Sequence, residues 1–291
     1  MYCAYPLFLG KMSVTINREQ QISILGCGWF GLPLAIEFVR IGHHVKGSTT
    51  SAEKVTLLKS KGIQAYKTEI NEMEIIGNLD FFQTEILFIA IPPKRSANEQ
   101  HTFVSKIENI IAAIRNSKVK QVIFISSTAI YGDDNHSVDE SSAPHPSTNS
   151  GKAILSSERL LQNEVSFTTT ILRFAGLIGP DRNPGNFFAN KKNIPNGRAP
   201  VNLIHLLDCI KICLSIVEKK AFGKIYNCCC PDHPQKQNFY TQASTRAQLP
   251  APEFIDELLN WKTVSSTNVN KYLKYDFEVP NWNSWLNATG K

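Results

Sequence analysis

The chain of 291 residues carries 31 Lys and Arg against 25 Asp and Glu, a net charge of only +6. The basic residues are scattered, which argues against a nucleic-acid-binding patch but is compatible with a basic pocket for an anionic ligand. No apolar stretch approaches the length of a membrane span, and the seven cysteines show no metal-ligand spacing. We therefore predict a cytoplasmic monomer or homodimer with no metal, nucleic-acid or membrane partner.

Residues 1–20 precede the first predicted strand and are expected to form a poorly ordered extension, in which Met12 is an alternative start to Met1. From residue 21 to 176, apolar runs typical of buried parallel strands alternate with helical periodicity. Strands are predicted over residues 21–25, 44–48, 63–66, 85–91, 121–126 and 168–174, and helices over 29–41, 52–61, 96–116 and 151–162. This alternation predicts an α/β fold, a Rossmann-type doubly wound parallel sheet that binds a dinucleotide.

The amino-acid composition changes after Gly176, and prolines and asparagines become frequent between residues 180 and 200. An amphipathic helix is predicted from about residue 205 to 218, followed by a strand, a second helix and a Trp- and Asn-rich tail. We interpret residues 177–291 as a small C-terminal α/β substrate lobe, some segments of which return to the main sheet.

A glycine-rich stretch, Gly26-Cys27-Gly28-Trp29-Phe30-Gly31, lies between the first predicted strand and helix. In that setting G-x-G-x-x-G typically binds a dinucleotide. The first glycine makes a tight turn, the second lets the pyrophosphate approach the backbone, and the third lets the helix pack on the strand, with its N-terminus facing the anion. The predicted cofactor contacts here and after the fourth strand are Gly26, Gly28, Trp29, Phe30, Gly31, Ile91 and Pro92.

The end of the second predicted strand bears on which dinucleotide binds. An acid that bonds the ribose is expected about 20 residues after the loop, but the stretch there, residues 45–51, has no Asp or Glu, and the next acid is Glu53. We therefore predict NADP in preference to NAD, since a 2′-phosphate would meet no repulsion and several polar groups. Those groups are Ser48, Thr49, Thr50 and Lys54. Ser51 is also a candidate N-cap for the next helix, and both roles are compatible.

Hydroxyl residues end the strand at 121–126, which continues as Ser126-Ser127-Thr128-Ala129-Ile130-Tyr131-Gly132. In open α/β sheets this end of a strand faces the ligand crevice. The segment resembles the extended short-chain dehydrogenase/reductases of the NAD-dependent epimerase/dehydratase superfamily. Residues 171–174, 201–208 and 224–227 resemble later motifs of that family, in the same order. The resemblance implies that Ser127 holds the substrate oxygen.

The family's acid/base tyrosine, in a Y-x-x-x-K motif, is missing. The matching stretch is Thr148-Asn149-Ser150-Gly151-Lys152. A tyrosine phenol has a pKa of about 10 that a nearby ammonium can lower, whereas a threonine hydroxyl is a far weaker acid. By the resemblance, Lys152 would bond the nicotinamide ribose and Thr148 would help polarise a carbonyl, with Tyr131 as the nearest other phenol.

Two further features narrow the resemblance. Leu25 stands where extended members have their first glycine, and residues 179–188 read G-P-D-R-N-P-G-N-F-F. Together with the missing tyrosine, they resemble the YeeZ-like atypical branch of the superfamily, which binds a dinucleotide.

Arginines are frequent in the part of the chain expected to form the substrate side. A planar guanidinium suits carboxylate or phosphate, so we predict a small-molecule, anionic substrate. For Arg182 and Arg198, loop solubility explains the residues equally well. The predicted substrate contacts are Thr128, Asn149, Arg173, Arg182, Asn186 and Arg198.

These patterns predict an NAD(P)-binding oxidoreductase or epimerase-like enzyme of the atypical short-chain type. The alternative is a non-catalytic NAD(P)-binding sensor or scaffold, because the acid/base residue is absent. A hydroxyacid-dehydrogenase-type Rossmann protein would fit residues 25–35, but such proteins continue into an all-helical domain, whereas this chain returns to strands.

Overall fold

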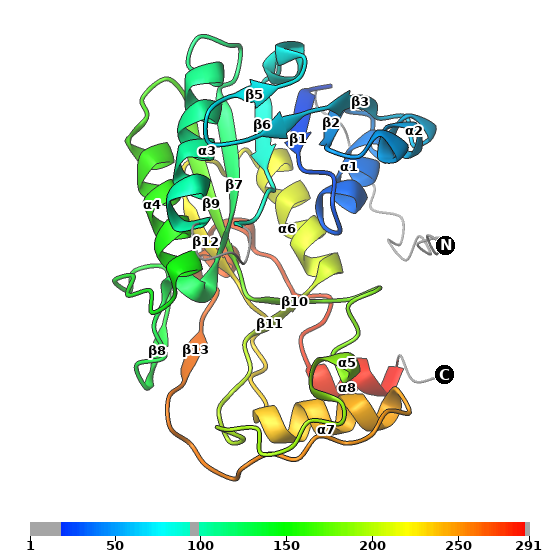
Figure 1. Cartoon of the computed structure of the whole chain (residues 1–291), viewed down its shortest axis with the longest axis vertical. Coiled ribbons are helices and arrows are strands. Elements are labelled where there is room, and N and C mark those ends of the chain that lie inside the picture. Colours follow the sequence, from blue (N-terminus) through cyan, green and yellow to red (C-terminus); the bar gives the residue numbers. More distant parts are fainter. Residues whose placement is uncertain (1–18, 94–98, 289–291) are drawn as a thin grey trace.

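Seven parallel strands form the central sheet of the computed structural model, which describes residues 19–93 and 99–288 (Figure 1). Their order across the sheet is β12-β9-β7-β6-β1-β2-β3, so strands are added in one direction from β1 and in the other from β6. This confirms the predicted doubly wound, Rossmann-type fold. The predicted N-terminal extension, with both possible start methionines, lies almost wholly outside the described residues. The strands are β1 (Gln21–Leu25), β2 (His44–Thr49), β3 (Gln64–Lys67), β6 (Ile86–Ile89), β7 (Gln121–Ser127), β9 (Thr168–Phe174) and β12 (Ile225–Cys228).

Helices cover both faces of the sheet. Helices α3 and α4 pack against each other on one face, and α1 contacts α6 on the other (Figure 1). Apolar side chains spaced four apart, such as Leu34 and Phe38 of α1, face the strands. Ser51 caps α2 by accepting a hydrogen bond from the Lys54 amide, as its sequence position predicts. The five helices are α1 (Gly31–Arg40), α2 (Ala52–Ser60), α3 (Glu99–Ile114), α4 (Asn149–Asn163) and α6 (Leu206–Glu218).

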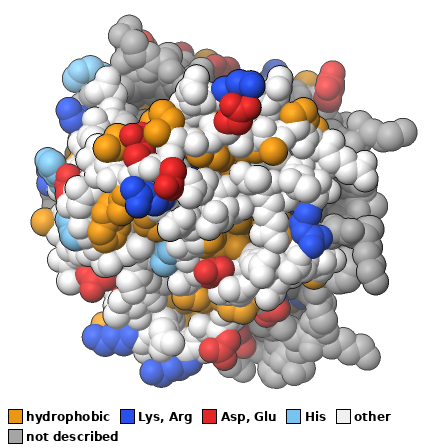
Figure 2. All heavy atoms as spheres, turned by 90° about the horizontal axis from the view of Figure 1, so that it is seen from below, with side chains coloured by type: hydrophobic (Ala, Val, Ile, Leu, Met, Phe, Trp, Pro, Cys, Tyr) orange, Lys and Arg blue, Asp and Glu red, His pale blue; other side chains and the backbone are white. Residues whose placement is uncertain are grey.

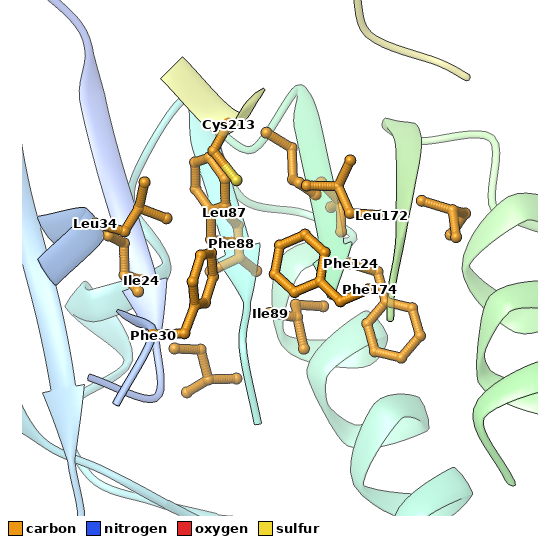
Figure 3. Close-up of a cluster of buried hydrophobic side chains, with 14 of the residues drawn as sticks. Ile24, Phe30, Leu34, Leu87, Phe88, Ile89, Phe124, Leu172, Phe174 and Cys213 are labelled. Atoms are coloured by element: carbon orange, nitrogen blue, oxygen red, sulfur yellow. The ribbon is translucent and has the colours of Figure 1, made fainter. Parts of the chain in front are cut away.

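The core lies between these layers. All four residues of β6 are buried, as expected for a central parallel strand covered on both faces. Figure 3 shows side chains of neighbouring strands side by side with those of the helices. Burial of each large apolar side chain contributes about 1.5–3 kcal/mol. Phe30, from the glycine loop, meets Phe174 at the end of β9 edge to face, with ring centroids 5.1 Å apart, so the core reaches the ends of the strands.

A second, smaller apolar cluster holds the C-terminal part together. It includes Phe239, Tyr240 and the fully buried Trp282. Strand β12 and helix α6 belong to the same C-terminal half of the chain but pack in the main layers (Figure 1). Seen from this end, the surface carries charges of both signs among small apolar areas (Figure 2). The elements of this part are β10 (Gly176–Ile178), α5 (Gly185–Phe188), β11 (Leu203–His205), α7 (Lys236–Arg246) and α8 (Trp282–Ala288).

Several short elements were not predicted. A strand in the polar loop after β7 pairs with one near the C-terminus, and β10 pairs with β11. Strands of two or three residues are too short to show periodicity, and β8, β10, β11 and β13 form through partners distant in the chain, whereas β4 and β5 pair locally. The remaining elements are β4 (Glu69–Ile70), β5 (Ile75–Ile76), β8 (His136–Val138), β13 (Lys262–Val264), η1 (Leu79–Phe82), η2 (Thr128–Ile130) and η3 (Val269–Leu273). Among the described helices, none is both long and apolar enough to cross a membrane.

Candidate cofactor and substrate site

A cavity of about 340 Å³ opens at the carboxyl ends of β1, β6, β7 and β9. Strands β1 and β6 are the pair at which the winding of the sheet reverses, and ligands of open α/β sheets bind at such a point. The described residues that line the cavity are Gly26, Gly28, Trp29, Phe30, Gly31, Ala90, Ile91, Pro92, Pro93, Ile125, Ser126, Ser127, Ile154, Phe174, Ala175, Leu177 and Arg182.

The glycine loop has the geometry that a dinucleotide requires. Gly26 has φ +100°, a conformation that side chains disfavour. A Cβ on Gly31 would lie 2.2 Å from the Gly26 carbonyl oxygen, so only glycine allows the start of α1 to pack this closely. At Gly28, by contrast, an added Cβ would meet no atom within 4 Å. That open space beside the backbone suits a pyrophosphate at the N-terminus of α1.

Residues of β2 support this loop from behind. The Gly26 amide donates a 2.9 Å hydrogen bond to Ser48 Oγ, and the Cys27 amide donates a 2.8 Å bond to the Ser48 carbonyl. Burial raises the pKa of the Cys27 thiol to about 12, so this cysteine stays neutral and serves as packing. Ser48 therefore has a structural role in the loop.

The four residues predicted to receive a 2′-phosphate divide into two pairs. Ser48 and Thr49 are buried, and their hydroxyl oxygens accept backbone amide bonds from Gly26 and Ser51. Thr50 is exposed and Lys54 half-buried, and these two are the better placed to receive a phosphate. None of the four lines the cavity.

On the opposite side, two serines at the end of β7 line the cavity. Ser127 Oγ accepts a 3.1 Å hydrogen bond from the Ala129 amide, so its own proton is available to a substrate oxygen. Ser126 Oγ donates to Glu158 Oε1, which leaves its lone pairs for a donor in the cavity. Successive side chains of a strand point to opposite faces, so the two hydroxyls serve different places, and Ser127 is the one whose proton remains available.

The T-N-S-G-K segment does not reach the cavity. Thr148 is exposed and caps α4, its Oγ1 accepting a 3.1 Å bond from the Gly151 amide. Lys152 is exposed, whereas Ile154 lines the cavity. Successive helix residues turn by about 100°, so Lys152 points about 200° away from Ile154. We therefore assign Thr148 and Lys152 no role at the nicotinamide.

The phase of α4 explains this outcome. Its buried face includes Gly151, Ile154 and Glu158, and Ile154 lies one turn before Glu158. A tyrosine and lysine spaced four apart on that face would occupy positions 150 and 154, where this chain has Ser150 and Ile154. Thr148 and Lys152 have the spacing of the motif, but the helix positions with that spacing that include the cavity residue Ile154 lie two residues later.

Arg173 and Tyr131 belong to a buried network behind the cavity. The Arg173 guanidinium donates to Glu158 Oε2 at 2.7 Å and to Tyr131 Oη at 2.7 Å. Tyr131 in turn is 2.9 Å from the Asp139 carbonyl oxygen and 3.0 Å from Asn227 Oδ1. Burial raises the pKa of Tyr131, so it is no better an acid than a free phenol. Arg173 as a substrate contact and Tyr131 as a catalytic phenol are corrected to internal structural roles.

Among the other predicted substrate contacts, only Arg182 lines the cavity. Its guanidinium carbon lies 4.3 Å from the centroid of the Trp29 ring. Arg198 is exposed and pairs with Asp256 at 3.4 Å, away from the cavity lining. The remaining three, of which only Thr128 is buried, also lie outside the lining: Thr128, Asn149 and Asn186.

Several cavity residues were absent from the predicted site. Most are apolar and lie at or shortly after the carboxyl ends of β6, β7 and β9, a position that identifies the ligand edge of a parallel sheet. Ile154 gave no such signal, because only the packing of α4 shows which face of the helix is turned inward. The missed residues are Ala90, Pro93, Ile125, Ser126, Ile154, Phe174, Ala175 and Leu177.

Comparisons with known proteins agree with this fold. Residues 93–229 match the sequence model of the NAD dependent epimerase/dehydratase family. The chain belongs to this family. Within it, the chain is similar to protein YeeZ of Escherichia coli (strain K12), with 32% identity over 267 residues that cover 90% of this chain and 97% of YeeZ. The resemblance drawn from the sequence motifs is confirmed.

Solved structures of low sequence identity share the fold. UDP-glucuronic acid 4-epimerase from Bacillus cereus, in complex with UDP-glucuronic acid and NAD, superposes with a TM-score of 0.76 at 17% identity, covering 93% of this chain and 98% of that one. A functionally unknown conserved protein from Silicibacter pomeroyi gives a TM-score of 0.74 at 20% identity, with 92% and 97% covered. In this chain the central sheet continues with β9 and β12, whereas a hydroxyacid-dehydrogenase-type protein would continue into an all-helical domain.

Proposed function

We propose that this protein is an NAD(P)-dependent oxidoreductase or epimerase-like enzyme that acts on a small molecule. The observation that carries the proposal is a single cavity in which the glycine loop faces the Ser126-Ser127 pair. A bound nicotinamide dinucleotide supplies the hydride donor or acceptor. Nucleotide sugars are the first substrates to examine, because the Bacillus cereus neighbour is described with UDP-glucuronic acid and NAD.

The chain's own residues have three tasks in this proposal. The open backbone at Gly28 and the N-terminus of α1 hold the pyrophosphate. The apolar side chains of Phe30, Ile91 and Phe174 exclude water from the reacting end. Ser127 donates its hydroxyl proton to the substrate oxygen, which polarises a carbonyl as charge develops on it.

Proton transfer has no dedicated side chain in the part of the cavity that is described. Apart from the Arg182 guanidinium, which does not lose its proton, its lining there contains no titratable acid or base. We infer that the proton is exchanged with water, since Thr148 and Lys152 lie on other faces of α4. This favours a slow enzyme over a fast one.

Calorimetric titration with NADP and NAD, followed by a substrate screen that monitors nicotinamide absorbance, tests the proposal. We expect Ser127→Ala to reduce turnover by about 10²–10³-fold, the range for loss of one oxyanion donor. Thr148→Ala is the matched control, a nearby hydroxyl outside the cavity, and should leave turnover unchanged. Failure of the protein to bind either dinucleotide would rule the function out.

We further propose that NADP is preferred to NAD. Residues 45–52, at the end of β2 and just after it, include no Asp or Glu, and Thr50 and Lys54 are not occupied in supporting the loop. Lys54→Gln should weaken NADP binding while NAD binding is retained; equal effects on both dinucleotides would contradict the preference.

A cytoplasmic location is part of the same proposal, supported by six described cysteines that are all unpaired. Fractionation of cells with an antibody to the protein tests it.

A non-catalytic NAD(P)-binding sensor is the second candidate function. It is favoured by one observation: the cavity position that a catalytic lysine would need is occupied by Ile154. The double variant Ser150→Tyr/Ile154→Lys places a tyrosine and lysine one turn apart on the inward face, and Thr148→Tyr is its out-of-phase control. The sensor function gains support if the wild type turns over nothing and only the double variant reduces carbonyls. Turnover by the wild type would exclude it.

A further inference from the structure

One charged side chain, Arg182, occurs among the described residues that line the cavity. The rest of that lining is apolar, glycine or serine, and no described Asp or Glu shares it. Arg182 is itself exposed, so it offers to an entering ligand a positive charge that water partly screens. The charge of this site therefore favours a ligand with a negative group.

Arg182 is held in place by contacts that span the cavity mouth. Its guanidinium carbon lies 4.3 Å from the centroid of the Trp29 ring, within the range of a cation–π interaction. The same indole donates a 2.6 Å hydrogen bond from Nε1 to the Pro180 carbonyl oxygen. Trp29 is part of the glycine loop, whereas Pro180 and Arg182 follow β10, so the indole joins the nucleotide loop to the opposite side.

The turn that carries Arg182 is itself closed. The Arg182 amide donates a 3.0 Å bond to the Gly179 carbonyl. Gly179 has φ +149°, and a Cβ there would lie 3.1 Å from Leu206 Cβ and 3.4 Å from the Trp29 ring. This packing leaves little freedom for the turn, so the guanidinium is pre-oriented and loses less entropy when it binds an anion.

We propose that Arg182, positioned by Trp29, selects substrates that carry a carboxylate or phosphate group; this inference rests on the proposed function. The other two arginines assigned to the substrate side have different partners. Arg173 is buried against Glu158, and Arg198 pairs with Asp256 outside the cavity lining. Trp29 acts as a positioning residue, since it holds the arginine through ring and backbone contacts.

The anion in question is that of the substrate rather than the cofactor's pyrophosphate. The pyrophosphate has its own binding place on the glycine loop, where Gly28 is open and the first amides of α1 are presented. Arg182 belongs to the turn beyond Trp29, between β10 and α5. Both groups are anions, so the experiment must separate them.

The test compares Arg182→Gln with Arg198→Gln, a matched loss of an exposed arginine outside the cavity. Affinities for NADP and NAD are measured first by calorimetry. The protein saturated with cofactor is then titrated with inorganic phosphate, glucuronate and the pair UDP-glucuronic acid and UDP-glucose. We expect Arg182→Gln to weaken the best-bound anionic probe at least about tenfold, the change that a lost charge-assisted hydrogen bond of 1.5–3 kcal/mol produces. Cofactor affinity and the Arg198→Gln variant should match the wild type.

Conservative variants test the positioning role of Trp29. Arg182→Lys keeps the charge but loses the planar group, so it should recover only part of the probe affinity. Trp29→Phe removes the Nε1 donor and weakens the cation–π contact. In protein saturated with cofactor, it should raise the dissociation constant of the anionic probes by a larger factor than it raises that of the cofactor, while the midpoint of thermal unfolding stays unchanged. Loss of all three together would make Trp29 a merely structural residue and overturn its positioning role.

Two results would overturn the selection by Arg182. One is that no probe binds the wild type more tightly than it binds Arg182→Gln. The other is a parallel loss of cofactor affinity in Arg182→Gln, which would assign the arginine to the pyrophosphate. If instead neither dinucleotide binds but the probes still distinguish wild type from Arg182→Gln, the proposed function fails while anion recognition by Arg182 stands.

Discussion

The two sides of the cavity differ in what their proposed roles require of the chain. The nucleotide wall, residues 26–31 with Ser48 behind them, depends on backbone geometry, and each of its requirements is met. The catalytic wall, Ser126, Ser127 and Ile154, depends on which side chains point inward, and its helix presents an isoleucine. A backbone cradle needs glycine at a few positions, whereas acid/base chemistry needs one side chain at one helical phase. Binding and catalysis can therefore be separated in this fold.

Breaking the support of the catalytic wall should have the largest effect. Arg173 and Glu158 are 3% and 1% exposed, so Arg173→Ala would leave a buried carboxylate without its partner. We expect a loss of about 3–5 kcal/mol in the free energy of unfolding, measured by urea denaturation. The exposed Arg198→Ala is the control and should change stability by less than about 1 kcal/mol. A loss of similar size in both variants would contradict the structural role of Arg173.

His205, at the N-terminus of α6, should make the stability of the protein depend on pH. Burial lowers the pKa of His205, which caps α6, to about 4 from an ordinary 6.5. Between these values the unfolded chain binds the proton and the folded chain does not, so stability is full above pH 6.5 and falls as the pH drops towards 4. The loss by pH 4 should reach about 3 kcal/mol.

Denaturation of wild type and His205→Gln across this range measures the contribution of the histidine. Glutamine can still accept the Leu207 amide bond but does not titrate. The wild type should therefore lose more stability than the variant on acidification. Equal slopes would show that folding does not lower the pKa of His205.

Within the nucleotide wall, Gly28 and Gly31 should not be equivalent. Gly31→Ala forces a Cβ against the Gly26 carbonyl oxygen, so it should destabilise by about 1–3 kcal/mol and weaken dinucleotide binding. Gly28→Ala meets no atom of the protein and should leave stability within about 1 kcal/mol, yet it occupies the space intended for the pyrophosphate. Unfolding and calorimetry of both variants together would distinguish packing from binding. Equal stability of the two would refute the close contact at Gly31.

The smallest expected effect concerns the support behind that wall. Ser48→Ala removes the acceptor of the Gly26 amide, and we expect a loss of about 1 kcal/mol in the free energy of unfolding. NAD and NADP affinities should fall by the same factor, because the serine acts on the loop rather than on a 2′-phosphate. A loss confined to NADP would return Ser48 to the role predicted from sequence.

Sequence patterns predicted well where local geometry and chemistry coincide. The loop at Gly26–Gly31, the parallel strands and the cavity serine Ser127 all lie where their motifs indicate. The prediction failed where the same residue type has two possible environments. Arg173 and Arg182 are both arginines near the end of β9 and β10, but one is buried against Glu158 and the other reaches the cavity. No local pattern distinguishes them.

The amino-acid sequence by itself determined the family, the doubly wound sheet and the nucleotide loop, because strand burial and glycine conformation are set over a few residues. Only the tertiary structure decided what meets that loop. The packing of α4 against its neighbours turns Ile154 inward and Lys152 outward, a difference of rotation that sequence spacing does not record. The turn after β10 likewise brings Arg182 into contact with Trp29, although the two residues are separated by more than half the length of the chain.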